Sequence, residues 1–277
     1  MTRTSTAALI TALLSACGGT GATTTPDFAG QPGADLAGSA AGDLSTMSGE
    51  GLALGGTWAG KNVDSQIFSG VLGMDTVTIT SLSRVQLVQN GTTLTSTTQV
   101  CAITLTPYKS SQTVYPAAAI AALGTSASAA TLSANAIGAT YTPSKQVQLS
   151  GWTATTNPQT DALPTAASDA RVMDTDSDGH PGVTLQITGF PAGNIYVAGR
   201  STVDIAATVA SNDRIAGSST THLSQNVLGS DNSLLAGSVI TAAPNTAPGA
   251  THYQMIRLPA GTDTCAQIVA QAATLFP

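Results

Sequence analysis

The sequence predicts a mainly β fold, an antiparallel up-and-down barrel of about eight strands with a C-terminal helix packed on it; a β-sandwich is the alternative. Only 9 % of the 277 residues are charged, against about 25 % in ordinary soluble domains, and small polar and apolar residues take their place. Apolar and polar residues alternate over several stretches, which is the period of a half-buried strand. Tight turns join these stretches in chain order, and a barrel leaves fewer exposed strand edges than a sandwich.

The first hairpin is predicted within residues 51–277, which we expect to form the folded domain. Residues 75–89 alternate, Asn90-Gly91 follows as a strong hairpin turn, and the Thr-rich residues 92–106 return as the next strand. Strict alternation would place Cys101 on the same strand face as Ile103 and Leu105.

The middle of the domain is less regular. Residues 116–123 predict a short helix that ends at Gly124. Residues 125–143 are rich in small side chains and predict a linker with one short element. Residues 147–152 predict a strand, and residues 153–172 predict a long polar loop.

The last third of the chain returns to regular alternation. Strands are predicted over residues 183–188, 195–209, 214–228 and 251–258. Residues 263–276 carry apolar side chains at helical spacing and predict a helix that packs on the sheet. Thr262 or Asp263 is expected to cap it.

The chain begins with a pattern typical of secretion. Residues 1–16 place Arg3 before a short apolar stretch, which is too short for a membrane-spanning helix. The sequence Leu14-Ser15-Ala16-Cys17 resembles the lipobox of bacterial lipoproteins. This resemblance implies cleavage before Cys17 and its lipidation, and Gly18 in place of Asp implies the outer membrane, on its periplasmic or cell-surface side. An ordinary signal peptide is the alternative.

Residues 17–50 hold few large apolar side chains, so we expect a lipidated Cys17 followed by a flexible tether. If Cys17 carries lipid, Cys101 and Cys265 remain as a pair in an oxidising compartment. A disulfide between them is predicted, with two buried free thiols as the alternative.

An acidic stretch stands out in a chain that is poor in charge. Asp174, Asp176 and Asp178 alternate, and Gly179 permits a sharp turn after them. Carboxylate oxygens suit calcium, and three carboxylates held close together would repel one another without a cation. The stretch predicts a calcium site; a solvated acidic turn between two strands is the alternative.

The acidic stretch resembles the first half of the EF-hand loop and the acidic repeats of dockerin and thrombospondin type 3 modules. The twelfth position is Leu185, where the EF-hand carries a bidentate Glu. The remaining ligands would then be the His180 carbonyl, water, or a carboxylate such as Asp169 or Asp161.

A second, shorter resemblance lies where the folded part begins. Residues 56–60 read Gly-Thr-Trp-Ala-Gly, and a Gly-x-Trp in the first strand resembles the lipocalin and calycin barrels. The resemblance implies that Trp58 plugs one end of a barrel. A Trp packed in any β-core is the alternative.

No motif predicts an enzyme. His222 and His252 lack the spacing of a zinc site, and no nucleophile elbow or phosphate-binding loop occurs. The net charge of −6 argues against nucleic acid as a partner. We expect a lipid-anchored extracytoplasmic β-domain with a calcium-stabilised loop and a structural or interaction role. The alternative is a calycin-like barrel that binds a small apolar ligand.

Overall fold

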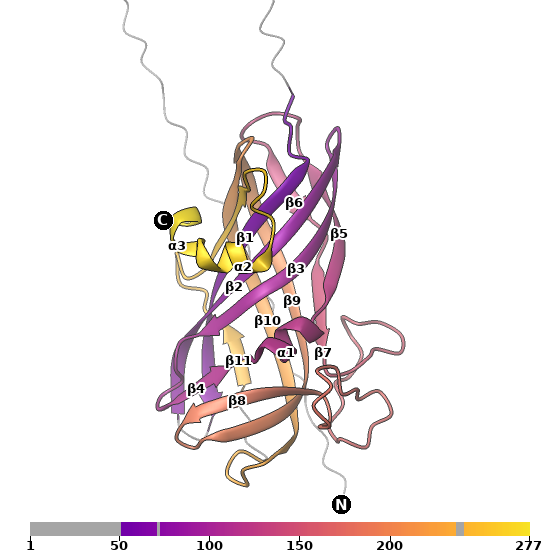
Figure 1. The fold of residues 1–277 in the computed structure, drawn as a ribbon, viewed down its shortest axis with the longest axis vertical. Helices are drawn as coiled ribbons and strands as arrows, with labels where there is room; N and C mark the ends of the chain where they lie inside the picture. The colour runs from indigo at the N-terminus through magenta and orange to yellow at the C-terminus, as the bar shows by residue number, and fades with distance from the viewer. Residues whose placement is uncertain (1–50, 71–72, 237–240) are drawn as a thin grey trace, which may run out of the picture. The chain divides into compact units, whose positions relative to one another are not determined.

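The computed structural model describes residues 51–70, 73–236 and 241–277. The predicted signal peptide (1–16) and lipidated tether (17–50) lie outside these described residues. The described chain is mainly β and forms an antiparallel sheet with short helices near the C-terminus (Figure 1). Within these residues, no helix has both the length and the apolar character needed to cross a membrane.

The described strands range from 4 to 19 residues in length. They are β1 (Gly56–Gly70), β2 (Gly73–Asn90), β3 (Thr93–Leu105), β4 (Ser111–Val114), β5 (Thr125–Leu132), β6 (Thr140–Pro143), β7 (Gln146–Ser150), β8 (Val183–Gly189), β9 (Gly193–Ser211), β10 (Arg214–Ser230), β11 (Thr241–Pro244) and β12 (His252–Arg257). Eight of them form a ring in the order β10, β12, β1, β2, β3, β5, β6 and β9, with β9 pairing back to β10. The predicted barrel is therefore confirmed.

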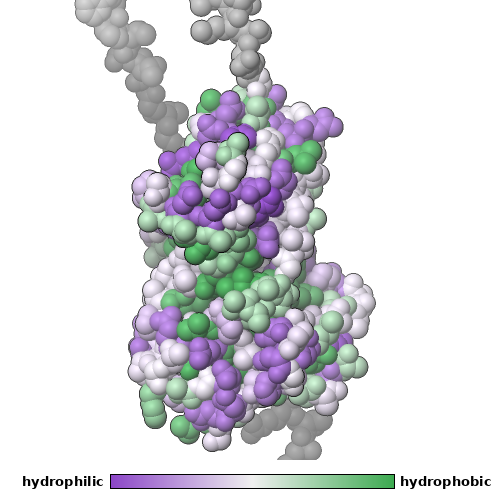
Figure 2. Space-filling view, in the orientation of Figure 1, coloured by the Kyte–Doolittle hydropathy of each residue, from purple (hydrophilic) through white to green (hydrophobic). Residues whose placement is uncertain are grey.

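The ring is only partly closed on one side. β6 pairs with β9 through Thr140 and Tyr141 alone, and β5 pairs with only the first half of β3. Below this contact, β7 and β8 continue the sheet from β9, and the short helix α1 (Ala117–Ala122) contacts both β3 and β8. Figure 2 shows apolar residues gathered across the middle of this face, around the place of α1 in Figure 1.

The long hairpins follow the predicted alternation. β2 and β3 meet at Asn90-Gly91, where Gly91 has φ 60°. The stretch expected to be a linker, residues 125–143, instead forms β5 and β6. Its Ala, Ser and Thr side chains offer little contrast in hydropathy, so backbone pairing with β3 rather than an apolar face decides its structure.

A bulge in β3 overturns the predicted face of Cys101. The register shifts where Leu82 and Ser83 of β2 face Ala102 and Val100, so Cys101 is the extra residue of β3. Cys101 and Ala102 therefore both pack on the outside of the barrel, whereas Ile103 lines the interior.

The C-terminal helix is shorter than predicted and is broken in two. It comprises α2 (Cys265–Ala270) and α3 (Ala272–Leu275). Thr264, rather than Thr262 or Asp263, caps α2, because Gln267 three residues later completes a capping box. Ile268 is fully buried against the outer face of the sheet.

Cys265, the first residue of α2, forms a disulfide with Cys101 of β3 across a separation of 164 residues. This is the pairing that the cysteine count predicts. The bulge in β3 turns the Cys101 side chain outward, toward the helix, and the bridge fixes α2 to the barrel wall.

Inside the ring, apolar clusters lie on either side of a polar middle. Trp58 is fully buried in a cluster to which all the other ring strands contribute inward-facing residues. Further along β1, Phe68 packs with Val77 and Tyr108 in a second cluster. Between them, the inward positions of β1 are polar: they hold Asn62, Asp64 and Gln66.

Candidate metal site and interior cavity

The three predicted aspartates converge. Asp174, Asp176 and Asp178 each present a carboxylate oxygen, and these oxygens all lie within 4.8 Å of one another. Ser177 (φ 59°) and Gly179 (φ 86°) both have left-handed backbone, which folds the loop back on itself. The loop therefore brings together an acidic group that could hold a metal ion.

Hydrogen bonds within the loop orient each carboxylate. Asp174 accepts from the backbone N–H groups of Asp178 (3.1 Å) and Gly179 (2.9 Å). The N–H of Thr184 at the start of β8 donates to Asp176 Oδ2 at 2.9 Å. The other oxygen, Asp176 Oδ1, is buried and has no hydrogen-bond partner among the described residues. One carboxylate oxygen of the group is therefore shielded from water and has no hydrogen-bond donor among the described residues.

Asp178 is the third member of the group, and its surroundings lower its pKa. Partial desolvation raises its pKa, but hydrogen bonds from the Thr184 hydroxyl and the His180 N–H outweigh this effect and leave the pKa below its ordinary value. Asp178 is therefore ionised at neutral pH and available to a cation.

A tight neck joins the loop to the barrel. Gly182 N–H donates to the Met173 carbonyl at 3.0 Å, and Met173 N–H donates to the Gly151 carbonyl at 3.0 Å. Gly182 (φ 91°) lies so close to β9 that a Cβ would stand 2.4 Å from the Val197 carbonyl oxygen. Only glycine fits at this neck, so the ends of the loop are fixed against a long ring strand.

The sequence predicts His180 as a ligand through its carbonyl, and its ring does not join the acidic group. The ring stacks on Tyr196 of β9, with centroids 4.1 Å apart and planes 7° from parallel. This stacking fixes the residue next to the acidic group. Ligation by the His180 carbonyl remains a prediction.

Asp161 and Asp169, the other candidate ligands, are engaged elsewhere. Asp161 accepts hydrogen bonds from the backbone N–H groups of Thr155 and Thr156, at 2.8 and 2.9 Å. Asp169 forms an ion pair with Arg171 at 2.7 Å. Hydrogen bonds from the side chain and backbone of Arg171 lower the pKa of Asp169 to about 2. Both residues stabilise the 153–172 loop, and neither belongs to the acidic group.

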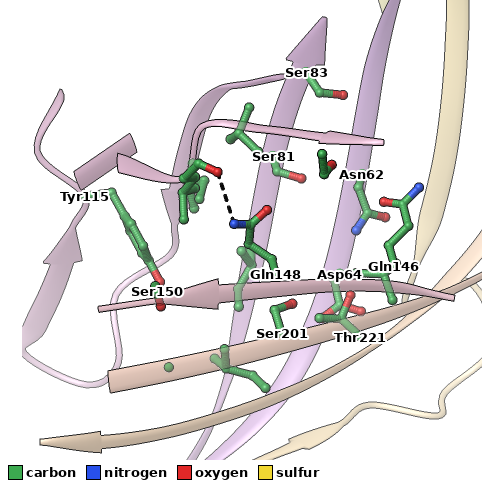
Figure 3. A pocket seen from close by; sticks show the side chains of 18 of the residues that line it. Asn62, Asp64, Ser81, Ser83, Tyr115, Gln146, Gln148, Ser150, Ser201 and Thr221 are labelled. Atoms are coloured by element: carbon green, nitrogen blue, oxygen red, sulfur yellow. Dashed lines mark hydrogen bonds between the residues drawn. The ribbon is translucent and has the colours of Figure 1, made fainter. Parts of the chain in front are cut away.

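A second candidate site lies inside the barrel. A cavity of about 220 Å³ is bounded by β1, β2, β3, β5, β7, β8, β9, β10 and β12, and by α1 and residues beside it. By the same measure one water needs only about 10–15 Å³. Figure 3 shows Asp64 beside Thr221 on one side of the pocket, with Tyr115 and Ser150 toward the other side. The cavity therefore has room for a small molecule between polar and apolar walls.

Asp64 is the charged group at the centre of the polar wall. Its side chain belongs to a residue only 2 % exposed, and its Oδ2 accepts a hydrogen bond from Gln66 Nε2. Its Oδ1 has no partner among the described residues, although Thr221 approaches the carboxylate. Burial raises the pKa of Asp64, and the contacts from Gln66 and Thr221 and the charge of His222 offset this only in part.

Gln66, like Asp64, is buried and has a side-chain oxygen without a hydrogen-bond partner among the described residues. It is fully buried, and its Nε2 also donates to the Thr221 carbonyl at 2.9 Å. Its Oε1 has no partner among the described residues. Two buried oxygen acceptors on neighbouring inward positions of β1 thus lack a donor.

Neither Asp64 nor Gln66 belongs to a motif that the sequence predicts as a site. The sequence nevertheless indicates where they point. Asp64 and Gln66 are an even number of residues from Trp58 along β1, so they lie on the same face of the strand, and Trp58 faces the interior. Polar residues at successive inward positions of a barrel strand indicate a polar interior rather than a packed core. The position of the tryptophan is what identifies these polar positions as inward.

Together, the fold and its sites define a β-barrel domain with an acidic loop held against β9 and a partly polar cavity inside the ring. No protein-family model matches the sequence, and the search of curated proteins gave no match either. The lipobox and Gly-x-Trp resemblances therefore rest on the sequence motifs alone.

Proposed function

We propose that this protein is a lipid-anchored extracytoplasmic β-barrel domain whose acidic loop binds calcium, and that its role is structural or in protein interaction rather than catalytic. The observation that carries the calcium proposal is the convergence of three carboxylates with one buried oxygen left unpartnered. Anchoring at Cys17 on the outer membrane rests on the lipobox resemblance, and the disulfide is consistent with an oxidising compartment.

Distance favours calcium over magnesium. Calcium binds oxygen at about 2.3–2.6 Å, so two of its ligands can lie up to about 5 Å apart, whereas magnesium at about 2.0–2.1 Å allows only about 4 Å. The three carboxylate oxygens all lie within 4.8 Å of one another, a range that calcium can bridge. The proposal therefore names calcium, whose longer bonds to oxygen accommodate the wider separations within this group.

Bound calcium would hold the acidic loop closed against the start of β8 and against Val197 of β9. The loop contributes little apolar burial of its own, so neutralising its carboxylates is the main stabilising effect available to it. The calcium-loaded loop then presents a fixed surface beside the barrel, and the lipid would keep that surface at the membrane.

Thermal unfolding of the full chain tests the proposal. Calcium at 100 times its dissociation constant stabilises by about 2.7 kcal/mol, which corresponds to a rise in Tm of about 5–10 °C over protein in chelator. Asp176→Asn should abolish this rise, and Asp204→Asn, which removes an exposed carboxylate paired with Lys145, should keep it. A Tm that is equal in calcium and in chelator would reject the calcium site.

The cavity favours a second candidate function, the binding of a small ligand inside the barrel. The supporting observation is the space of about 220 Å³ between apolar and polar walls. A neutral apolar probe such as 1-hexanol tests the space alone: ligand-observed NMR should detect saturable binding. If 1-hexanol does not bind, the cavity is not a binding site for small apolar molecules.

A further inference from the structure

One buried carboxylate in the cavity is short of a partner. Asp64 is 2 % exposed, lines the cavity, and leaves Oδ1 without a hydrogen-bond partner among the described residues. Burying a carboxylate is costly unless it is paired and hydrogen-bonded. A positively charged donor facing the cavity would therefore stabilise the ionised carboxylate at this position.

The protein itself supplies no such donor in the described chain. Lys61 and Arg200 both border the cavity, but their charged groups are engaged elsewhere. The Lys61 ammonium lies 5.6 Å from the centre of the Phe276 ring, and Arg200 donates to the Asp161 carbonyl at 2.8 Å, in the 153–172 loop. His222 follows Thr221 on β10 and is exposed. None of the ion pairs among the described residues includes Asp64.

The groups next to Asp64 supply no positive charge. Gln66 lies beside Asp64 without lining the cavity, its Oε1 is buried and unpartnered among the described residues, and its Nε2 donates to the Thr221 carbonyl. An anion would be repelled by this wall. A bare divalent cation would find one carboxylate where calcium takes six to eight oxygen ligands. A group with several N–H donors and a positive charge matches the wall.

The apolar walls of the cavity indicate the chemical character of the rest of the ligand. Apolar side chains from several strands face the cavity, among them Val85, Val100, Ile103, Val147, Val203 and Ile205. The space exceeds what a single ammonium ion needs and suits a short hydrocarbon or ring attached to it.

We propose that the barrel cavity binds a small organic amine, whose ammonium group pairs with the Asp64 carboxylate while its apolar body packs on the valine and isoleucine wall. This inference rests on the second candidate function and specifies its ligand class. It replaces the purely apolar ligand that the Gly-x-Trp resemblance implied.

Three probes of equal length test the charge preference: n-hexylamine, 1-hexanol and hexanoate, titrated into the full chain at pH 7 and followed by ligand-observed NMR. The amine should bind at least tenfold more tightly than the alcohol, and hexanoate should bind most weakly. This comparison uses the unaltered protein and so does not depend on the folding of any variant.

A charge-neutral variant then tests the residue. Asp64→Asn keeps the size of the side chain and should lower the affinity for hexylamine at least tenfold, while that for 1-hexanol changes less than twofold. Asp204→Asn, on the exposed side of β9, should leave all three affinities unchanged. Retained hexanol binding shows that the Asp64→Asn variant is folded.

The outcomes separate this inference from the function on which it rests. If hexanol binds and hexylamine is no tighter, the cavity takes neutral ligands and the role of Asp64 is overturned. If hexylamine is preferred equally in Asp64→Asn, the amine is held elsewhere and the assignment is also overturned. If none of the probes binds, ligand binding in the cavity fails altogether.

Discussion

The guanidinium of Arg257 lies over the ring of Trp58, 4.7 Å from its centroid. The same guanidinium donates to the carbonyls of Gly55 (2.6 Å) and Asn212 (2.9 Å) and forms an ion pair with Asp213 at 2.8 Å. One side chain at the end of β12 therefore joins the start of β1 to the β9–β10 turn. It also covers the tryptophan that fills this end of the barrel.

Replacing this arginine should weaken that end of the ring. In Arg257→Lys the charge remains, but a lysine cannot donate to the carbonyls of Gly55 and Asn212 and stack on Trp58 at the same time. We expect the free energy of unfolding to fall by about 1.5–3 kcal/mol, measured by urea unfolding. Arg214→Lys, at an exposed position of β10, is the control. Equal losses in both variants would refute the role of Arg257.

The disulfide should be a major source of stability. It closes a loop of 164 residues between Cys101 and Cys265, and removing such a bridge typically costs about 2–5 kcal/mol. The double variant Cys101→Ser, Cys265→Ser should unfold at lower denaturant concentration than the parent protein. Reductant should destabilise the parent protein to the same extent and leave the double variant unchanged. A parent protein insensitive to reductant would contradict this prediction.

Asp64 should make stability depend on pH in an unusual direction. Burial raises its pKa in the folded state, so the folded protein holds this proton more tightly than the unfolded chain does. The stabilising effect of the proton is complete below the unfolded pKa of about 3.9 and is lost as the pH rises through the folded value. Ligand-free Asp64→Asn should therefore be more stable than the parent protein at pH 7, by about 1–3 kcal/mol, and equally stable near pH 3.

Asp161 supplies a control of opposite sign. Hydrogen bonds from the backbone N–H groups of Thr156, Asn157 and Thr155 lower its pKa. Its contribution is present above the unfolded pKa and is lost as the pH falls through the folded value. Asp161→Asn should be less stable than the parent protein at pH 7. If both variants shift in the same direction, the burial of Asp64 is not what sets its effect.

Lipid attachment gives a prediction for the N-terminus. Cells that express the full chain and are fed labelled palmitate should incorporate the label into this protein. Cys17→Ser should lose the label, and Cys101→Ser should retain it, because the lipobox resemblance assigns the modification to Cys17 alone. Labelling that persists in Cys17→Ser would disprove the anchor.

The parts of the fold that could be predicted from sequence are those with strong local signals. The β2–β3 hairpin follows from alternation and Asn90-Gly91, and the convergence of Asp174, Asp176 and Asp178 follows from their spacing next to a glycine. In both cases neighbouring residues determine the local structure, because few other backbone conformations suit the same short sequence.

What escaped prediction depends on partners far along the chain. β5 forms because β3 offers it a free edge, although its Ala, Ser and Thr residues give little contrast in hydropathy. The bulge at Cys101 is set by register against β2, and Thr264 becomes the cap through Gln267. The burial of Asp64 without a charged partner follows only from the closure of the ring, which brings β1 and β10 together.

Calcium titration of the full chain by isothermal calorimetry tests the central claim most directly. The account predicts one calcium ion bound per chain, weaker binding of magnesium, and loss of calcium binding in Asp176→Asn but not in Asp204→Asn. Absence of calcium binding at millimolar concentration, or unchanged binding in Asp176→Asn, would contradict it.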